Sequence, residues 1–196
     1  MSQQGMHSPI LIETQPGSYA MFLYPDMSAV KIFRKCLRES LEKYNFGVED
    51  ILQVELAADE AVTNSIAANV TCNSEETIIC RWIIHDMKIT LYILDYGAGF
   101  KSKSPVLNEE SEIKPNSIES FLEQVKSHQA TKPDTLPFHG MKVGHKNVGK
   151  GLKIIYSLMD SVKILFHANG VVVDAPGEHV SGSIVELEYD VKKRVQ

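Results

Sequence analysis

The order of helical and strand-like segments is the feature that most restricts the fold. Two consecutive helical patterns, over residues 27–44 and 48–69, stand between two pairs of strand-like segments. These pairs are residues 9–13 and 19–24 before the helices, and Glu75–Ile84 and Lys88–Leu94 after them. Helices thus follow each other and strands neighbour strands, unlike the strand–helix alternation of parallel α/β folds. We predict an α+β two-layer sandwich with a mixed, mostly antiparallel sheet backed by helices.

The second half of the chain contains a long polar stretch. Residues 101–148 are polar and carry four prolines, with one predicted helix over Ser117–Ser127. A stretch of this length inside a compact domain is usually functional or disordered. A helix over Leu152–Met159 and strands over Ser161–His167 and Gly182–Tyr189 are predicted to follow it. We therefore expect one domain over residues 1–196, with an extended lid or insertion at about 101–148.

Composition excludes several classes of function. The chain has 20 Lys and Arg against 25 Asp and Glu, a formal charge of −5, which argues against direct nucleic-acid binding. No run approaches the about 18 apolar residues of a membrane span, and no secretory leader is recognisable. The three cysteines form no CxxC pair. We expect a cytoplasmic protein with reduced thiols and no membrane or nucleic-acid partner.

A carboxylate and an amide share one stripe of the second predicted helix. Glu60 and Asn64 are four residues apart, within about 40° of each other around the helix axis. A hard cation such as Mg²⁺ takes oxygen ligands, which an Asn side chain provides, and a neighbouring Glu is a candidate base. Spacing alone favours a solvated helix face over such a site.

Two glycine-rich segments lie at the ends of predicted elements. Asp95-Tyr96-Gly97-Ala98-Gly99 follows a strand, where glycines permit close backbone approach and the carboxylate can accept from an amino group such as that of adenine. A simple turn explains this segment equally well.

The second segment, residues 144–151, contains the GxxxxGK pattern of a phosphate-binding loop. Gly151 stands where that loop needs a hydroxyl, and no clear strand precedes it, so we reject that interpretation. The glycine pattern of dinucleotide-binding folds is also incomplete, because neither glycine pair is followed by the third glycine that this pattern requires. What remains is a glycine-rich entry into a helix, whose free amides favour phosphate.

In this order and spacing the three segments resemble a known superfamily. Residues 55–66, ELAADEAVTNSI, look like the N-box of the GHKL, or Bergerat-fold, ATPases. Asp95-x-Gly97-x-Gly99 and Gly149-Lys150-Gly151-Leu152 resemble their two glycine boxes. The wording EAVTNSI and the later SLMDSV are closest to the anti-sigma factor serine/threonine kinases of bacteria. The resemblance extends over residues 8–190.

The resemblance implies a role for each matching residue. Asn64 would coordinate Mg²⁺ bridging the phosphates of ATP, and Glu60 would be the catalytic base. Asp95 would hold the adenine amino group, with the backbone closing in at Gly97 and Gly99. The remaining expected ATP-binding positions are Gly149, Lys150, Gly151 and Ser183.

The resemblance also implies partners and an activity. The expected function is an anti-sigma regulatory factor that phosphorylates a serine of an anti-anti-sigma antagonist and sequesters a sigma factor. A homodimer is also expected. The alternative is a catalytically silent nucleotide-binding module that acts only by protein capture. A third interpretation, the ATPase half of a sensor histidine kinase, is disfavoured because we find no preceding dimerisation helix with a phosphorylatable histidine. Two departures from the family pattern are the longer stretch between the glycine boxes and the pair Ala68-Asn69, where the family often has His-Gly or His-Ala.

Overall fold

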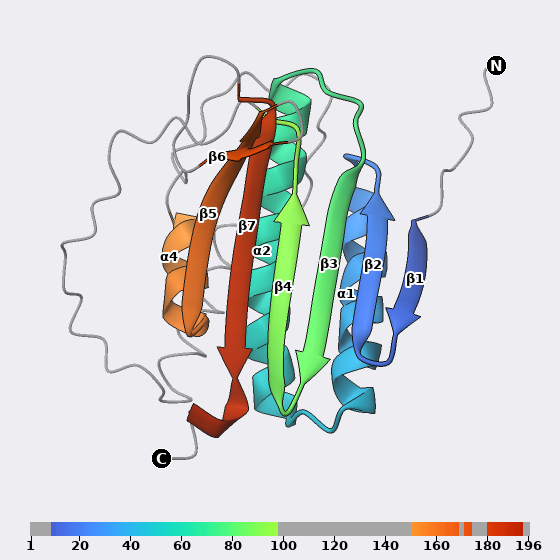
Figure 1. Ribbon diagram of the computed structural model, residues 1–196, viewed down its shortest axis with the longest axis vertical. Helices are drawn as coiled ribbons and strands as arrows, with labels where there is room; N and C mark the ends of the chain where they lie inside the picture. The colour runs from blue at the N-terminus through green and yellow to red at the C-terminus, as the bar shows by residue number, and fades with distance from the viewer. Residues whose placement is uncertain (1–8, 98–149, 169–170, 174–179, 194–196) are drawn as a thin grey trace.

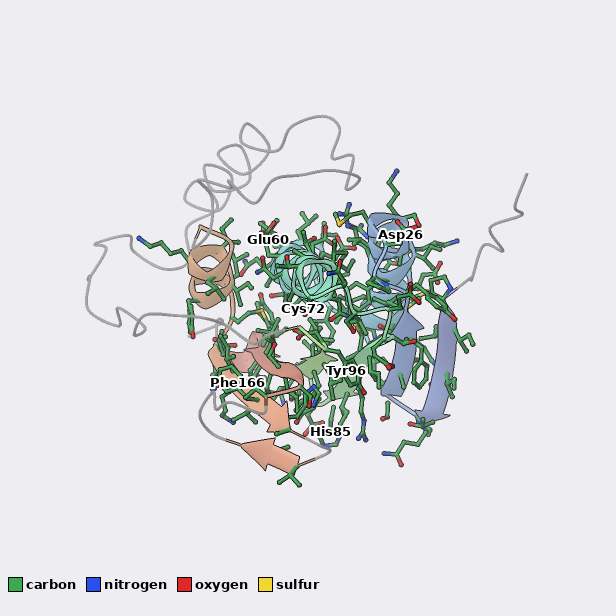
Figure 2. All side chains as sticks on the ribbon, turned by 90° about the horizontal axis from the view of Figure 1, so that it is seen from above. Asp26, Glu60, Cys72, His85, Tyr96 and Phe166 are labelled. Atoms are coloured by element: carbon green, nitrogen blue, oxygen red, sulfur yellow. The ribbon has the colours of Figure 1, made fainter. Side chains whose placement is uncertain are left out.

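The computed structural model has two layers, a seven-stranded sheet and a layer of helices on one side of it (Figure 1). It describes residues 9–97, 150–168, 171–173 and 180–193. Seen from above, the three α-helices formed by these residues all lie on the same side of the sheet (Figure 2). The predicted α+β two-layer sandwich is confirmed.

The sheet is antiparallel at every pairing between described strands. Its spatial order is β1-β2-β3-β4-β7-β5-β6, so β4 lies at the centre and β7 inserts between β4 and β5. The strands are β1 (Ile10–Gln15), β2 (Ser18–Leu23), β3 (Ile78–His85), β4 (Lys88–Leu94), β5 (Ser161–Ala168), β6 (Val171–Val173) and β7 (Gly182–Asp190). This order brings the end of β4 next to the beginning of β7, where Leu94 pairs with Ile184 although the two residues are distant in the chain.

The helices follow their sequence signals closely. Helix α1 (Met27–Lys43) begins after Asp26, whose side chain accepts from the Ser28 backbone N–H at 2.8 Å. Helix α2 (Val48–Thr71) follows after a short connection, and α4 (Lys150–Leu158) precedes β5. A short 3-10 helix (Val191–Lys193) follows β7. None of the described helices is long and apolar enough to cross a lipid bilayer.

Trp82 anchors the core between the sheet and α1. Its ring is fully buried, packs edge-on against Phe33 at 5.9 Å between centroids, and its indole N–H donates to the Ser40 hydroxyl at 2.8 Å. Its neighbours two residues away along β3, Cys80 and Ile84, are also buried. Because side chains alternate along a strand, the intervening residues of β3 point to the other side of the sheet.

Two ion pairs fix α2 against α1. The Arg34 Nε donates to Asp59 Oδ1 at 3.1 Å and the Arg38 Nε donates to Glu55 Oε1 at 2.8 Å, and each guanidinium also contacts the second carboxylate oxygen. Hydrogen bonding to Asp59 raises the pKa of Arg34, and hydrogen bonding to Glu55 raises that of Arg38. Each pair joins one guanidinium to both oxygens of one carboxylate, so Glu55 and Asp59 serve to hold the two helices together.

Two sequence expectations differ from the structure or lie outside it. Strand β6 was not predicted, because its three residues are shorter than the runs on which strand prediction rests. The predicted helix over Ser117–Ser127 and the proposed lid at 101–148 lie outside the described residues.

Candidate functional site

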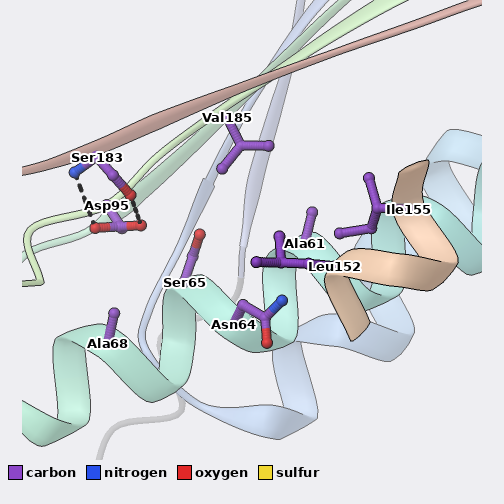
Figure 3. Close-up of a pocket in the computed structure, with 9 residues that line it drawn as sticks. All are labelled: Ala61, Asn64, Ser65, Ala68, Asp95, Leu152, Ile155, Ser183 and Val185. Carbon is purple, nitrogen blue, oxygen red and sulfur yellow. Dashed lines mark hydrogen bonds between the residues drawn. The ribbon is translucent and has the colours of Figure 1, made fainter. Parts of the chain in front are cut away.

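A pocket of about 130 Å³ lies between α2, α4 and the ends of β4 and β7 (Figure 3). Its lining is apolar except for a few polar groups gathered from distant parts of the chain. The lining residues are Ala61, Asn64, Ser65, Ala68, Asp95, Leu152, Ile155, Ser183 and Val185. An apolar cavity with a few convergent polar groups is the usual form of a small-molecule site.

Asp95 is the most constrained polar residue of this pocket. It is 2% exposed, and its carboxylate accepts three hydrogen bonds. Oδ1 accepts the backbone N–H groups of Gly97 at 3.0 Å and Ser183 at 3.1 Å, and Oδ2 accepts the Ser183 hydroxyl at 2.7 Å. Figure 3 shows the two contacts with Ser183. The carboxylate therefore has a fixed orientation, because its two oxygens accept from Ser183 on β7 and from Gly97 in the loop that follows β4.

Glu60 and Asn64 lie against the first turn of α4. A β-carbon built on Gly151 would stand 2.7 Å from Glu60 Oε2 and 3.5 Å from Asn64 Nδ2. Only glycine leaves both side chains in place, because 2.7 Å is shorter than a normal carbon–oxygen contact. The sequence segments containing Glu60, Asn64 and Gly151 thus meet at one place, beside the pocket.

The prediction of a solvated face for the Glu60–Asn64 stripe is wrong. Glu60 is only 8% exposed, and Asn64 is half-buried. The reason is the packing of α4 onto this face of α2, which periodicity within α2 does not reveal. A carboxylate is rarely buried without a structural or chemical reason.

Gly97 permits a second close approach. A β-carbon on Gly97 would stand 2.4 Å from the β-carbon of Ala68, so only glycine fits beside α2 at this point. The alternative of a simple turn after β4 does not account for this contact. Gly97 brings the loop that carries Asp95 directly onto the helix that carries Asn64.

Two residues that the sequence analysis did not assign hold the Asp95 loop. Asn69 is fully buried; its Oδ1 accepts the Tyr96 backbone N–H at 2.8 Å and its Nδ2 donates to the Glu76 carbonyl at 2.9 Å. His167, on β5, contacts the Asp95 carbonyl through Nε2 at 2.7 Å. A carbonyl only accepts, so Nε2 carries the proton. The departure from the family pattern at Ala68-Asn69 was the sequence signal that could have identified Asn69. No sequence signal pointed to His167, because its contact with the loop depends on the order of the strands in the sheet.

The other candidate residues are placed only in part. Gly99 and Gly149 lie outside the described residues, and Lys150 begins α4 with its side chain outside them. Within the described part of the chain, no three His, Cys, Asp or Glu side chains gather as a metal cluster.

Comparison with protein families decides the classification. Residues 24–175 match the model of the histidine kinase-like ATPase domain, which is more than half of the chain. The chain belongs to the histidine kinase-like ATPase family. No curated protein shows a significant match to the sequence. The matched region contains Glu60, Asn64, Asp95 and Gly151, whereas Ser183 and Val185 of the pocket lie beyond it. Membership supports ATP binding by this histidine kinase-like ATPase domain.

Proposed function

We propose that this histidine kinase-like ATPase domain is a protein serine/threonine kinase of the anti-sigma type. It would transfer the γ-phosphoryl group of ATP to a serine of an antagonist protein and capture a sigma factor. The observation that carries the proposal is the burial of Glu60 beside Asn64 at the first turn of α4. A module that only binds nucleotide has no need for a carboxylate at that point.

The pocket supports an assignment of the adenine end. Asp95 would accept from the adenine amino group, and the apolar side chains of Leu152, Ile155 and Val185 would cover the ring. The hydrogen bonds from Ser183 keep the carboxylate from rotating away. Preorganised acceptors of this kind favour a base that has an amino group in the matching position, because guanine would present a carbonyl there.

The residues beside Gly151 fit the magnesium–phosphate end. The Asn64 amide supplies an oxygen ligand, and the absence of a carboxylate cluster among the described residues suits Mg²⁺, which is commonly held by few protein groups and by substrate phosphates. When bound, Mg²⁺ would neutralise charge on the phosphate oxygens. Gly151 carries no side chain, so its backbone would be able to approach the same phosphates.

Glu60 would act as the base in transfer. Its carboxylate takes the proton of the attacking serine hydroxyl, the serine oxygen bonds to the γ-phosphorus, and the bond to the β,γ-bridging oxygen breaks to release ADP. Proton and phosphoryl group are thereby both accounted for. Positioning and charge neutralisation supply most of the rate in such reactions.

Incubation of the full chain with γ-labelled ATP, Mg²⁺ and a candidate antagonist protein tests the proposal. We expect label on a serine of the antagonist, and none when Glu60→Gln replaces the wild type. ATP affinity is measured on the same samples by calorimetry. Tight ATP binding without label on any candidate antagonist would favour the capture-only module, whereas absence of ATP binding would contradict the site itself.

A further inference from the structure

The peptide bond that follows Asp95 has both of its polar atoms held by side chains. The Asp95 carbonyl accepts from Nε2 of His167 at 2.7 Å, and the Tyr96 N–H donates to Oδ1 of Asn69 at 2.8 Å. The carbonyl and the N–H belong to one planar trans unit, in which they point in opposite directions. Two side chains from distant parts of the chain therefore fix the orientation of this peptide.

The pairing between β4 and β7 explains why this carbonyl needs a partner from elsewhere. Asp95 lies opposite Ser183, just beyond the end of β4, and its N–H donates to the Ser183 carbonyl at 2.9 Å. In an antiparallel ladder, two residues paired in this way exchange both hydrogen bonds. Here the Ser183 N–H donates instead to Oδ1 of the Asp95 carboxylate, at 3.1 Å. The carboxylate thus takes the place of the Asp95 carbonyl in the ladder, and the carbonyl is paired with His167.

Gly182 allows His167 to reach that carbonyl. His167 on β5 lies opposite Gly182 on β7, and β7 separates β5 from β4 in the sheet. A β-carbon built on Gly182 would overlap the Asp95 carbonyl oxygen and stand 2.5 Å from Nε2 of His167. The imidazole is 6% exposed and packs edge-on against the Tyr96 ring at 5.1 Å between centroids. The contact across β7 therefore depends on the absence of a side chain at position 182.

Asn69 holds the same peptide from the helix layer. It is fully buried near the end of α2, and its Nδ2 donates to the Glu76 carbonyl at 2.9 Å. Because the amide nitrogen is held by a carbonyl, the amide oxygen has to face the Tyr96 N–H. The peptide is thus held by α2 through Asn69 and by β5 through His167.

We propose that Asn69 and His167 are positioning residues for base selection by Asp95. The proposal rests on the assignment of the Asp95 carboxylate to the adenine amino group. Without the His167 donor, the buried Asp95 carbonyl lacks a partner and gains by accepting the Ser183 N–H, as in a regular ladder. The carboxylate then loses this N–H and moves from the place where it would meet the amino group.

Selectivity for the base distinguishes this role from a purely structural one. Inosine triphosphate (ITP) has a carbonyl where ATP has the amino group, so a correctly placed carboxylate favours ATP. A variant that only unfolds more easily binds both nucleotides less well by the same factor, because both require the folded state. The ratio of the dissociation constant for ITP to that for ATP therefore reports the position of the carboxylate.

Calorimetry on the full chain with Mg²⁺ measures this ratio. We expect a ratio of at least about ten for the wild type and about one for Asp95→Ala, which has no acceptor. Asn69→Leu and His167→Leu remove the polar groups at similar side-chain size, and each should lower the ratio at least about threefold. His167→Gln supplies an amide N–H in place of the imidazole N–H and should restore most of the ratio.

Ser40→Ala is the matched structural control. It removes the hydroxyl that accepts from the buried indole of Trp82, far from the nucleotide pocket, and should lower stability without changing the ratio. If Asn69→Leu does not fold, the two His167 variants decide the outcome. A ratio reduced equally in Ser40→Ala would overturn the proposal, because the ratio would then follow stability alone.

The crystal structure of His167→Leu provides a readout that needs no nucleotide. We expect the Ser183 N–H to donate to the Asp95 carbonyl in that variant, with the carboxylate displaced. An undisplaced carboxylate, or a wild-type ratio in both Asn69→Leu and His167→Leu while Asp95→Ala loses it, would overturn the positioning role alone. Equal affinity of the wild type for ATP and ITP would instead overturn the adenine assignment and the positioning role together.

Discussion

A β-carbon on Gly151 would lie 2.7 Å from Oε2 of Glu60, closer than carbon and oxygen normally approach. The first turn of α4 and the middle of α2 therefore meet at a point where α4 has no side chain and α2 has a buried carboxylate. The absence of a side chain at position 151 is what allows Glu60 to lie at the site.

Gly151→Ala should separate folding from function. The methyl group displaces the Glu60 side chain, while alanine favours the helix by up to about 1 kcal/mol relative to glycine. We expect unchanged or higher stability to urea, with phosphoryl transfer reduced about 10²-fold. Gly47→Ala, at the N-cap of α2, is the matched control and should lower stability slightly without changing ATP affinity. Full transfer activity in Gly151→Ala would contradict the geometry.

Asn64→Ala removes the amide oxygen proposed for Mg²⁺. ATP affinity measured by calorimetry should then be lost in the presence of Mg²⁺. Thr63→Ala, on the preceding residue of the same helix, should retain both ATP affinity and its dependence on Mg²⁺. Equal ATP affinity in wild type and Asn64→Ala would rule out the metal role.

Glu60→Gln keeps the shape of the side chain and removes its basicity. ATP binding should remain, while the transfer rate to the antagonist protein falls by about 10²–10⁴. Single-turnover measurements with pre-bound ATP separate the chemical step from binding. Glu49→Gln, an exposed carboxylate at the start of α2, serves as control, and an equal loss there would show that the effect is not specific to the site.

Ser183→Ala leaves the buried carboxylate of Asp95 without its hydroxyl donor. The free energy of unfolding should fall by about 1–3 kcal/mol, because a buried charged acceptor loses a hydrogen bond. ATP affinity should fall as well, since Oδ2 of Asp95 then lacks the donor that helps to fix its position. Ser157→Ala, on the exposed side of α4, should change stability by less than about 0.5 kcal/mol. Identical urea midpoints for the two variants would contradict this assignment.

The three thiols should differ in reactivity toward a disulfide reagent at pH 8. Burial raises the pKa of Cys80 far above that pH, so little thiolate exists in the folded protein, and the residue is fully buried. Cys72 is exposed and should react first; Cys36 is half-buried with a pKa raised mainly by burial and should follow. Urea should make Cys80 react. Rapid reaction of all three thiols in the native protein would show that the core around Trp82 is open.

Strands, helices and the site-bearing segments were predictable because their signals are local. Apolar spacing at Val30, Phe33, Leu37 and Leu41 identifies α1, and Asp26 marks its start. Alternation locates β4 without error at Lys88–Leu94. Strand β6 was not predicted, because it is only three residues long. The pair Asn169-Gly170, which separates two apolar runs in the sequence, is a hairpin signal, but so short a second run is weak evidence for a strand.

The tertiary structure decided what each polar residue does. The sequence by itself determined that Glu55, Asp59 and Glu60 all lie on one helix, but all three are acidic residues in a similar local setting. Only packing distinguishes them: α1 brings Arg34 and Arg38 to the first two, and α4 brings Gly151 to the third. Likewise, strand order alone carries His167 to the carbonyl of Asp95, 72 residues earlier in the chain. Local periodicity reports which side of an element a residue occupies, whereas the neighbour on that side depends on contacts between segments distant in sequence.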